Sequence, residues 1–199
     1  MRVLFLIGDL AGVGGTERVT CDLASALAER GETVEVLSVF GTDEPFFPLD
    51  ARVARSALGM AEARGSLLRA AGISRALTRA ALARRPDALV AVDSVLFAFL
   101  APMLAVRRPR LVCWEHFHLN TDHGTPLRRL GRWLAARRAG TVVVLTDRDA
   151  ASWRARFGPA VPVVAIPNAV PPLDPAQRAA AEPGAPRRVL AVGRMTAQK

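Results

Sequence analysis

Cysteine, lysine and tyrosine are scarce or missing in this sequence of 199 residues. Its two cysteines, Cys21 and Cys113, stand far apart and form no Cys-x-x-Cys pair, which excludes a disulfide scaffold. Tyrosine is absent and Lys199 is the one lysine, so the net charge of +9 comes from arginine. Because 51% of the residues are hydrophobic, the sequence is not that of an intrinsically disordered chain.

The sequence also lacks targeting and nucleic-acid signals. Met1 and Arg2 are followed by only a short apolar run, which is not a secretory leader, so we expect a cytoplasmic protein. Residues 88–106 have the length of a membrane span, but Asp93 and Pro102 interrupt them, and a buried strand followed by a helix explains them better. No basic stripe interleaved with aromatic residues is present, so we expect no nucleic-acid partner.

Short apolar runs alternate with segments of helical periodicity along the chain. We expect strands at Val3–Ile7, Thr33–Phe40, Arg52–Leu58, Ala88–Val92, Arg110–Trp114, Thr141–Leu145 and Val161–Ile166. We expect helices at Thr16–Arg30, Ala61–Arg85, Ser94–Val106, Thr125–Arg138 and Thr146–Phe157, the last with Thr146 as its N-cap. Strands that alternate with helices in this way predict an α/β fold with a parallel sheet and helices on both of its faces.

The first helix carries Val19, Leu23, Ala26 and Leu27 at helical spacing, and we expect these side chains to face the core. Gly31 is a typical residue to end this helix.

A change in composition divides the chain near residue 170. Residues 171–186 are rich in proline, alanine and charge, which is typical of a linker. The following apolar run opens a new buried strand, so residues 187–199 are expected to begin a second, truncated domain. The first domain then spans residues 1–170.

A glycine-rich loop, Gly8 to Gly15, lies between the first strand and the first helix. Bare amides and the dipole at a helix N-terminus favour an anion, and glycine lets a phosphate approach closely. The loop lacks the Gly-Lys-Ser/Thr of a Walker motif and the Gly-x-Gly-x-x-Gly of a dinucleotide site. The alternative is a tight turn whose glycines only allow close packing.

All three histidines of the chain lie within residues 114–123, after a predicted strand. The carboxyl ends of parallel strands are where α/β sheets place their ligands, so one histidine is expected to face a substrate. Two alternatives stay open. His116 and His118 could hold zinc together with Asp122 or His123, or these histidines could be hydrogen-bonded loop residues.

The last residues form a third signal. Arg194 and Lys199 follow the final apolar run, and a guanidinium fork with a point charge suits a diphosphate.

In this order, Gly14-Gly15-x-Glu17, Ile166-Pro167-Asn168 and Gly193-Arg194 with Gln198-Lys199 resemble the family 4 retaining glycosyltransferases of GT-B architecture. The resemblance implies that residues 1–170 are the Rossmann-like amino-terminal domain, on the acceptor side. It also implies that residues 187–199 are the start of the carboxy-terminal donor domain.

The resemblance implies roles at matching positions. Gly14 and Gly15 would approach the diphosphate of a nucleotide-sugar donor, and His116 would face the donor sugar near the reacting carbon. Arg194 and Lys199 would neutralise the leaving group, so no metal or other cofactor is expected. The sugar would pass to an acceptor with retention, in cell-surface glycan or glycolipid synthesis. Because most of the donor domain is missing, these 199 residues alone are expected to be inactive.

Polar residues that follow predicted strands are the acceptor-side candidates: Asp9, Thr16, Asp93, Ser94 and Asn120. Ser94 and Thr16 would serve equally well as helix caps. Asn168 is expected to tie the hinge between the domains.

The helix at residues 125–138 has two interpretations. Its arginines, among them Arg128, Arg129 and Arg132, surround four apolar residues at helical spacing: Leu127, Leu130, Trp133 and Leu134. Such a helix can lie on an anionic membrane that carries a lipid-linked acceptor, or it can be a surface helix with an apolar core face.

Two other functions remain open for the whole chain. One is a metal-dependent hydrolase that uses the cluster from His116 to His123. The other is a non-catalytic phosphate-binding module.

Overall fold

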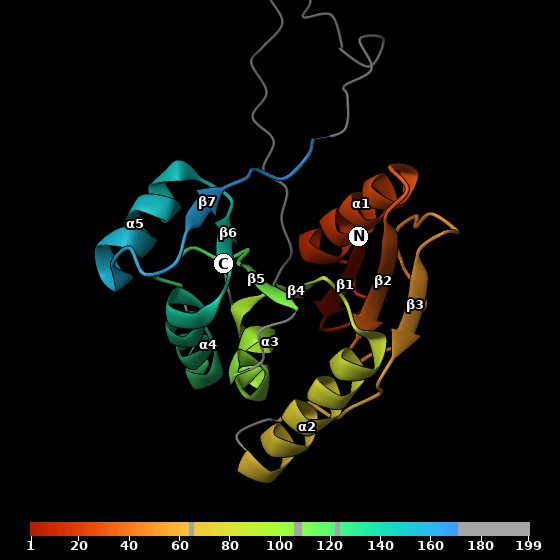
Figure 1. Ribbon diagram of the computed structural model, residues 1–199, viewed down its shortest axis with the longest axis horizontal. Coiled ribbons are helices and arrows are strands. Elements are labelled where there is room, and N and C mark those ends of the chain that lie inside the picture. The colour runs from red at the N-terminus through yellow and green to blue at the C-terminus, as the bar shows by residue number, and fades with distance from the viewer. Residues whose placement is uncertain (64–65, 106–108, 122–123, 171–199) are drawn as a thin grey trace, which may run out of the picture. The chain divides into compact units, whose positions relative to one another are not determined.

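A seven-stranded parallel sheet forms the centre of the domain, in the order β3-β2-β1-β4-β5-β6-β7 (Figure 1). The computed structural model describes residues 1–63, 66–105, 109–121 and 124–170. The strands are β1 (Arg2–Ile7), β2 (Thr33–Ser38), β3 (Ala54–Ala57), β4 (Ala88–Val92), β5 (Arg110–Trp114), β6 (Thr141–Val144) and β7 (Val163–Ala165). All six neighbouring pairs are parallel, which confirms the predicted α/β class and each predicted strand.

Helices cover both faces of the sheet, as the buried side chains show. They are α1 (Gly15–Glu29), α2 (Leu67–Arg84), α3 (Ser94–Phe99), α4 (Pro126–Arg138) and α5 (Asp147–Phe157), with a 3-10 turn, η1 (Ala101–Ala105). In β1, Leu4 and Leu6 pack with α2 to α5, whereas Val3, Phe5 and Ile7 pack with α1. This alternation follows from the period of two residues in a strand, and it requires strands that are apolar on both faces.

Two helices differ in extent from the sequence prediction. The helix predicted from Ala61 begins at Leu67, because the Ser66 side chain accepts the Arg69 amide and caps it there. The helix predicted at Ser94–Val106 ends at Phe99 and continues as η1. Pro102 has no amide hydrogen to continue the α-helical pattern. At the other helices the predicted Thr146 cap is confirmed, since its hydroxyl accepts the Asp149 amide.

The predicted core face of α1 is partly wrong. Small residues make its buried stripe: Thr20, Cys21, Ala24 and Ala28. Leu23 is exposed, and Val19 and Leu27 are only partly buried against the core. Small side chains let the helix axis approach the sheet closely, so the larger apolar residues are displaced to the rim.

Helix α4 has the predicted apolar core face only in part, because Leu127 and Leu134 pack against the core while two arginines also turn inward. Arg128 and Arg132 are only 7% and 3% exposed, whereas Leu130 and Trp133 are each 46% exposed. Gly131 lies on the inward face, where a Cβ atom would come within 1.8 Å of the Ser94 carbonyl oxygen. Because the helix contacts the backbone of α3, its inward arginines are enclosed in the protein and cannot contact a membrane.

None of the helices in the described ranges is long and apolar enough to cross a membrane. Residues 88–105, which have the length of a span, fold instead as β4, α3 and η1.

Residues Met1–Asn168 form one compact unit, and Ala169–Lys199 are grouped apart from it. The predicted linker, the predicted second-domain strand, Arg194 and Lys199 lie outside the described residues, as do Asp122 and His123. The predicted domain boundaries stay a prediction.

Candidate functional site

A polar cleft of about 630 Å³ opens at the carboxyl edge of β1 and β2. Its lining joins the loop after β1, the loop after β2 and the start of α2: Gly8, Asp9, Phe40, Gly41, Met60, Ala61, Glu62 and Arg69. Both signs of charge and open backbone are present in it, which suits a hydroxyl-rich ligand.

Asp9 is the predicted acceptor-side residue that lines this cleft. Its Oδ1 atom accepts the Ala11 amide at 3.0 Å and the Thr42 amide at 3.3 Å. Gly41 makes room for this carboxylate, because an added Cβ would lie 1.8 Å from Oδ1. The sequence analysis did not identify Gly41, although a glycine directly after a buried strand was visible as a signal of close approach.

The glycine loop leads into α1 with Gly14 as its N-cap and no side-chain cap. The Glu17 carboxylate folds back over the loop, so that a Cβ at Gly14 would lie 2.3 Å from its Oε2 atom. Thr16 donates its hydroxyl to the same carboxylate at 3.1 Å, so it does not cap the helix. Gly15 is exposed, and a Cβ there would meet nothing within 4 Å. An anion that approaches this loop therefore meets the Glu17 carboxylate as well as the amides.

His116 follows β5 and stacks on Trp114, with the ring centroids 4.5 Å apart. Trp114 belongs to the same buried cluster as Leu10 of the glycine loop, so His116 lies on the α1 side of the sheet edge. Its Nε2 atom is buried and has no hydrogen-bond partner among the described residues. Burial lowers the pKa of His116 to about 4, against the attraction of Glu115, so the ring is neutral at pH 7.

The other described histidine contacts a different part of the structure. His118 is exposed, with its Nε2 atom 3.7 Å from Asp149 Oδ1 and its Nδ1 atom accepting the Asn120 amide. Within the described ranges no three His, Cys, Asp or Glu side chains are placed to hold a metal ion. The zinc alternative also needs Asp122 or His123, which lie outside the described residues, and it stays a prediction.

Asn120 lies apart from the polar cleft. It lines a separate cavity of about 470 Å³ between α4 and α5, beside Trp133 and Arg156. The structure thus does not bring Asp9 and Asn120 to one pocket.

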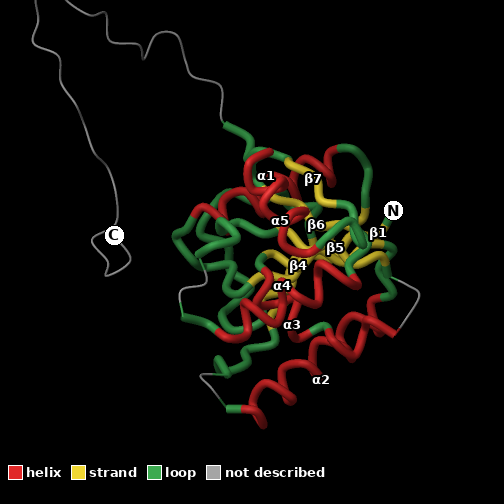
Figure 2. The backbone as a smooth tube through the Cα atoms, turned by 90° about the vertical axis from the view of Figure 1, so that its left-hand side faces the viewer, coloured by secondary structure: helices red, strands yellow, loops and turns green. Residues whose placement is uncertain are grey.

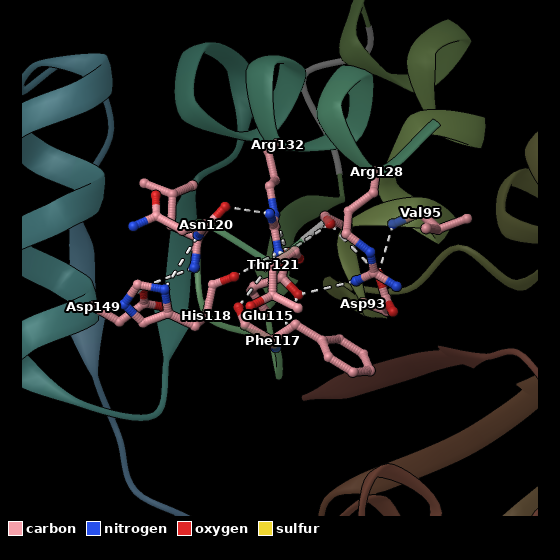
Figure 3. A network of polar contacts seen from close by, with 12 residues as sticks. Asp93, Val95, Glu115, Phe117, His118, Asn120, Thr121, Arg128, Arg132 and Asp149 are labelled. Carbon is pink, nitrogen blue, oxygen red and sulfur yellow. Dashed lines mark hydrogen bonds and ion pairs between the residues drawn. The ribbon is translucent and has the colours of Figure 1, made fainter. Parts of the chain in front are cut away.

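A buried network of four charged side chains lies behind the carboxyl edge (Figure 3). Glu115 is 1% exposed and accepts Arg132 Nε at 2.8 Å. Arg128 lies between the two carboxylates, 2.9 Å from Asp93 Oδ1 and 3.4 Å from Glu115 Oε1. Two buried positive charges therefore compensate two negative ones, as enclosed charges require.

Arg132 also holds the loop that follows β5. Its guanidinium donates to the carbonyl oxygens of Leu119 at 2.5 Å, Thr121 at 3.0 Å and His118 at 3.2 Å. The loop amide of Leu119 is fixed in turn by Asp149 Oδ1 at 3.0 Å. Figure 3 shows the Arg132 side chain extending from α4 toward Thr121 and Glu115, while Arg128 points toward Asp93. This clamp fixes the segment directly after His116.

Asp93 closes the network at the end of β4. It has φ +98°, a strained value for a residue with a side chain, and it caps α3 by accepting the Val95 amide at 2.8 Å. Burial, with the nearby Glu115 carboxylate, raises the pKa of Asp93 from its ordinary value, against the pull of Arg128.

Ser94 is enclosed in the protein, contrary to its expected place on the acceptor side. Its side chain is fully buried and donates its hydroxyl to Glu115 Oε2 at 2.6 Å. An acceptor substrate has no access to it, and the helix cap at this position is Asp93.

The network was not predicted from the sequence. Glu115 immediately follows a buried strand, and Arg128 and Arg132 are four residues apart and so share one face of α4. Together these two signals could have indicated a buried ion pair between Glu115 and an arginine of α4.

Asn168 ends the first compact unit, and its Oδ1 atom is buried without a hydrogen-bond partner in the described part of the chain. Its expected role at a hinge stays a prediction.

Comparison with known proteins gives a family match over most of the chain. The model of Glycosyltransferase Family 4 matches residues 13–172. An uncharacterized glycosyltransferase from Haemophilus influenzae is 29% identical over 157 residues, which is 78% of this chain and 44% of that protein. The chain thus spans less than half the length of this curated relative.

Solved structures share the fold at low sequence identity. The lipopolysaccharide outer core galactosyltransferase WaaB matches with a TM-score of 0.64 at 16% identity, over 85% of this chain and 46% of WaaB. Sucrose-phosphate synthase from Thermosynechococcus elongatus matches with a TM-score of 0.64 at 15% identity, over 83% of this chain and 47% of the synthase. Anabaena HepE in complex with UDP matches with a TM-score of 0.57 at 20% identity, over 85% of this chain and 44% of HepE. The fold is the Rossmann-like half of a GT-B glycosyltransferase.

Proposed function

Because the chain belongs to glycosyltransferase family 4, we propose that the protein transfers a sugar from a nucleotide-sugar donor to an acceptor hydroxyl. The observation that carries the proposal is the family match over residues 13–172. The structural neighbour HepE was solved with UDP-glucose, which supports a nucleotide sugar as the donor.

On the donor side, His116 is the residue we assign to the donor sugar. Its ring is neutral at pH 7 and only partly buried at the end of β5, and both features support this role. The amides at Gly14 and Gly15 would face the diphosphate once the Glu17 carboxylate turns aside. Arg194 and Lys199 would neutralise the leaving diphosphate without a metal ion. The configuration at the reacting carbon would be retained.

On the acceptor side, the polar cleft is the proposed binding site. Asp9 and Arg69 line it. Thr16, in the first turn of α1, and Asp93, directly after β4, are the further candidates. The product would belong to cell-surface glycan or glycolipid synthesis in the cytoplasm. Because the matched relatives are more than twice as long as the matched region, transfer is proposed for a protein with both GT-B halves. Residues 1–199 alone are expected to bind acceptor without transferring sugar.

The test compares sugar transfer by the intact gene product with and without a change at His116. Products from a panel of UDP-, GDP- and ADP-sugars with alkyl glucoside acceptors are identified by mass spectrometry. The proposal expects transfer from one donor and a loss of at least about 100-fold in kcat for His116→Ala, the usual scale for a group that acts on the transition state. His118→Ala, on the same loop, is the matched control and keeps transfer.

Donor hydrolysis without transfer would contradict the proposed transferase function, and transfer that survives His116→Ala would contradict the assignment of His116. Phosphate binding with no chemistry on any donor would favour the non-catalytic module instead.

A further inference from the structure

An apolar groove of about 650 Å³ lies where the first turns of α2, α3 and α4 meet. Figure 2 shows α2 lying along α3 on one side of the sheet. Most of the lining is apolar and includes Phe40, Leu67, Ala70, Phe99, Leu127 and Leu130. Phe40 and Phe99 contact each other edge to face, with centroids 6.5 Å apart. A volume of this size is typical of a small-molecule site.

The groove leaves large apolar side chains in contact with water. Leu67 is 86% exposed and Leu130 is 46% exposed. Contiguous apolar surface of this kind costs free energy in water and is a usual mark of a binding site. The charged residue in the lining is Glu62, which stands at one end.

That end is where the groove meets the polar cleft. Phe40 and Glu62 line both cavities, so the two lie side by side. Beyond them the cleft presents Asp9 and Arg69. The combined site is thus polar at the edge of β1 and β2 and apolar between the helices. A ligand that fills both must have a polar head and an apolar chain.

We propose that the acceptor is an amphiphile whose alkyl chain occupies this groove while its hydroxyl head lies in the polar cleft. The inference rests on the proposed function, because that function assigns the cleft to the acceptor. One alkyl chain binds between the helices, and the protein does not lie on a bilayer through this surface. One molecule is favoured because the two cavities adjoin at Phe40 and Glu62 and differ in polarity.

Binding of alkyl glucosides to the 199-residue chain tests the groove without any donor. Methyl, butyl, hexyl and octyl β-D-glucosides are titrated below their micelle concentrations by isothermal calorimetry. Each methylene buried in the groove tightens binding about threefold to fourfold. We therefore expect affinity to rise with chain length, and we expect Leu67→Asp to remove most of this rise.

Leu68→Asp is the matched control. Leu68 is the next residue of α2, is 87% exposed and does not line the groove. A second groove variant, Leu130→Asp on α4, guards against an effect specific to the start of α2. Circular dichroism and thermal melting establish that all three variants fold.

The outcomes separate the alternatives. Chain-length dependence that is lost in both groove variants and kept in Leu68→Asp supports the proposal. No chain-length dependence, or equal loss in Leu68→Asp, overturns it, and the latter result indicates a bilayer-type surface contact. Transfer to short sugars by the intact protein, with no chain-length effect, overturns the groove and leaves the glycosyltransferase function standing. Alkyl binding without any transfer supports the groove and contradicts the glycosyltransferase function.

Discussion

Arg132 Nε lies 2.8 Å from Glu115 Oε2, and both side chains are enclosed by protein. The pair links α4 to the end of β5, next to His116. Removing one partner of such a pair leaves an uncompensated buried charge, which is more costly than losing the attraction itself. The network therefore makes α4 and the carboxyl edge of the sheet depend on each other.

The first prediction concerns this pair. Glu115→Gln keeps the shape of the side chain but leaves the Arg132 charge without its partner, so the free energy of unfolding should fall by about 3–5 kcal/mol. Arg132→Met should cost a similar amount, and the double variant should cost less than the sum of the two. Urea denaturation followed by circular dichroism measures all three.

Glu44→Gln provides the control for charge removal. Glu44 pairs with Arg55 at 3.4 Å in an exposed position, so its loss should cost less than about 1 kcal/mol. Equal costs for Glu115→Gln and Glu44→Gln, or strict additivity in the double variant, would show that the buried pair is not coupled.

The second prediction concerns the carbonyl clamp. Arg132→Lys keeps the charge but offers one compact ammonium in place of a fork that reaches several carbonyls. Each hydrogen bond to a charged group contributes about 1.5–3 kcal/mol, so amides of the loop should exchange roughly tenfold to hundredfold faster. Hydrogen exchange at Leu119, read by NMR, reports this directly.

Arg137→Lys is the control on the same helix. Arg137 is exposed and contacts the Trp133 ring and carbonyl, so its change should leave the Leu119 amide unaffected. If Leu119 exchanges at the wild-type rate in Arg132→Lys, the clamp does not order the loop.

The strands could be predicted because their sequences admit few alternatives. Runs such as Val3–Ile7 and Ala88–Val92 are apolar on both faces, and such runs are stable only between two layers of helix. Once these strands are parallel, Asp9, Asp93 and His116 must all follow strand ends at one edge. The edge of the site was therefore predictable from short-range pattern alone.

The orientation of α4 could not be predicted in the same way. Helical spacing shows that Arg128 and Arg132 share a face, but it does not say which face turns inward. The inward face depends on Asp93, directly after β4, and on Glu115, directly after β5. Leu130 and Trp133 lose burial in exchange, and Gly131 with Ala135 allows the close approach. The compensation of buried charge is a three-dimensional property, so local periodicity could not show that two arginines turn inward beside the apolar residues.

The third prediction contrasts two glycines inside helices. At Gly131 a Cβ would lie 1.8 Å from the Ser94 carbonyl oxygen, so Gly131→Ala must separate α4 from α3. Overpacking of this kind costs about 1–3 kcal/mol or more. At Gly72 of α2 nothing lies within 4 Å of the added atom, so Gly72→Ala should stabilise the protein by up to about 1 kcal/mol.

Chemical denaturation of the two variants gives opposite signs if the contact is as described. A neutral or stabilising Gly131→Ala would mean that α4 does not pack on the α3 backbone.

The fourth prediction follows from the low pKa of His116. Burial lowers it from 6.5 to about 4, so between these values the unfolded chain binds more protons than the folded one. The free energy of unfolding therefore falls as the pH drops from 6.5 toward 4, by about 3 kcal/mol from this group. The raised pKa of Asp93 acts in the opposite sense, because the folded state holds that proton at pH values above 3.8.

His116→Gln and His116→Phe isolate the contribution of the imidazole. Neither variant can take up the proton, and Asp93 is unchanged in both, so each should show a smaller fall in stability between pH 6.5 and pH 4. Urea melts at half-unit steps of pH, with the wild-type slope as reference, measure the difference. A wild-type slope in both variants would mean that His116 is solvated and charged in the folded protein, and the assignment of its neutral ring to a sugar hydroxyl would fail with it.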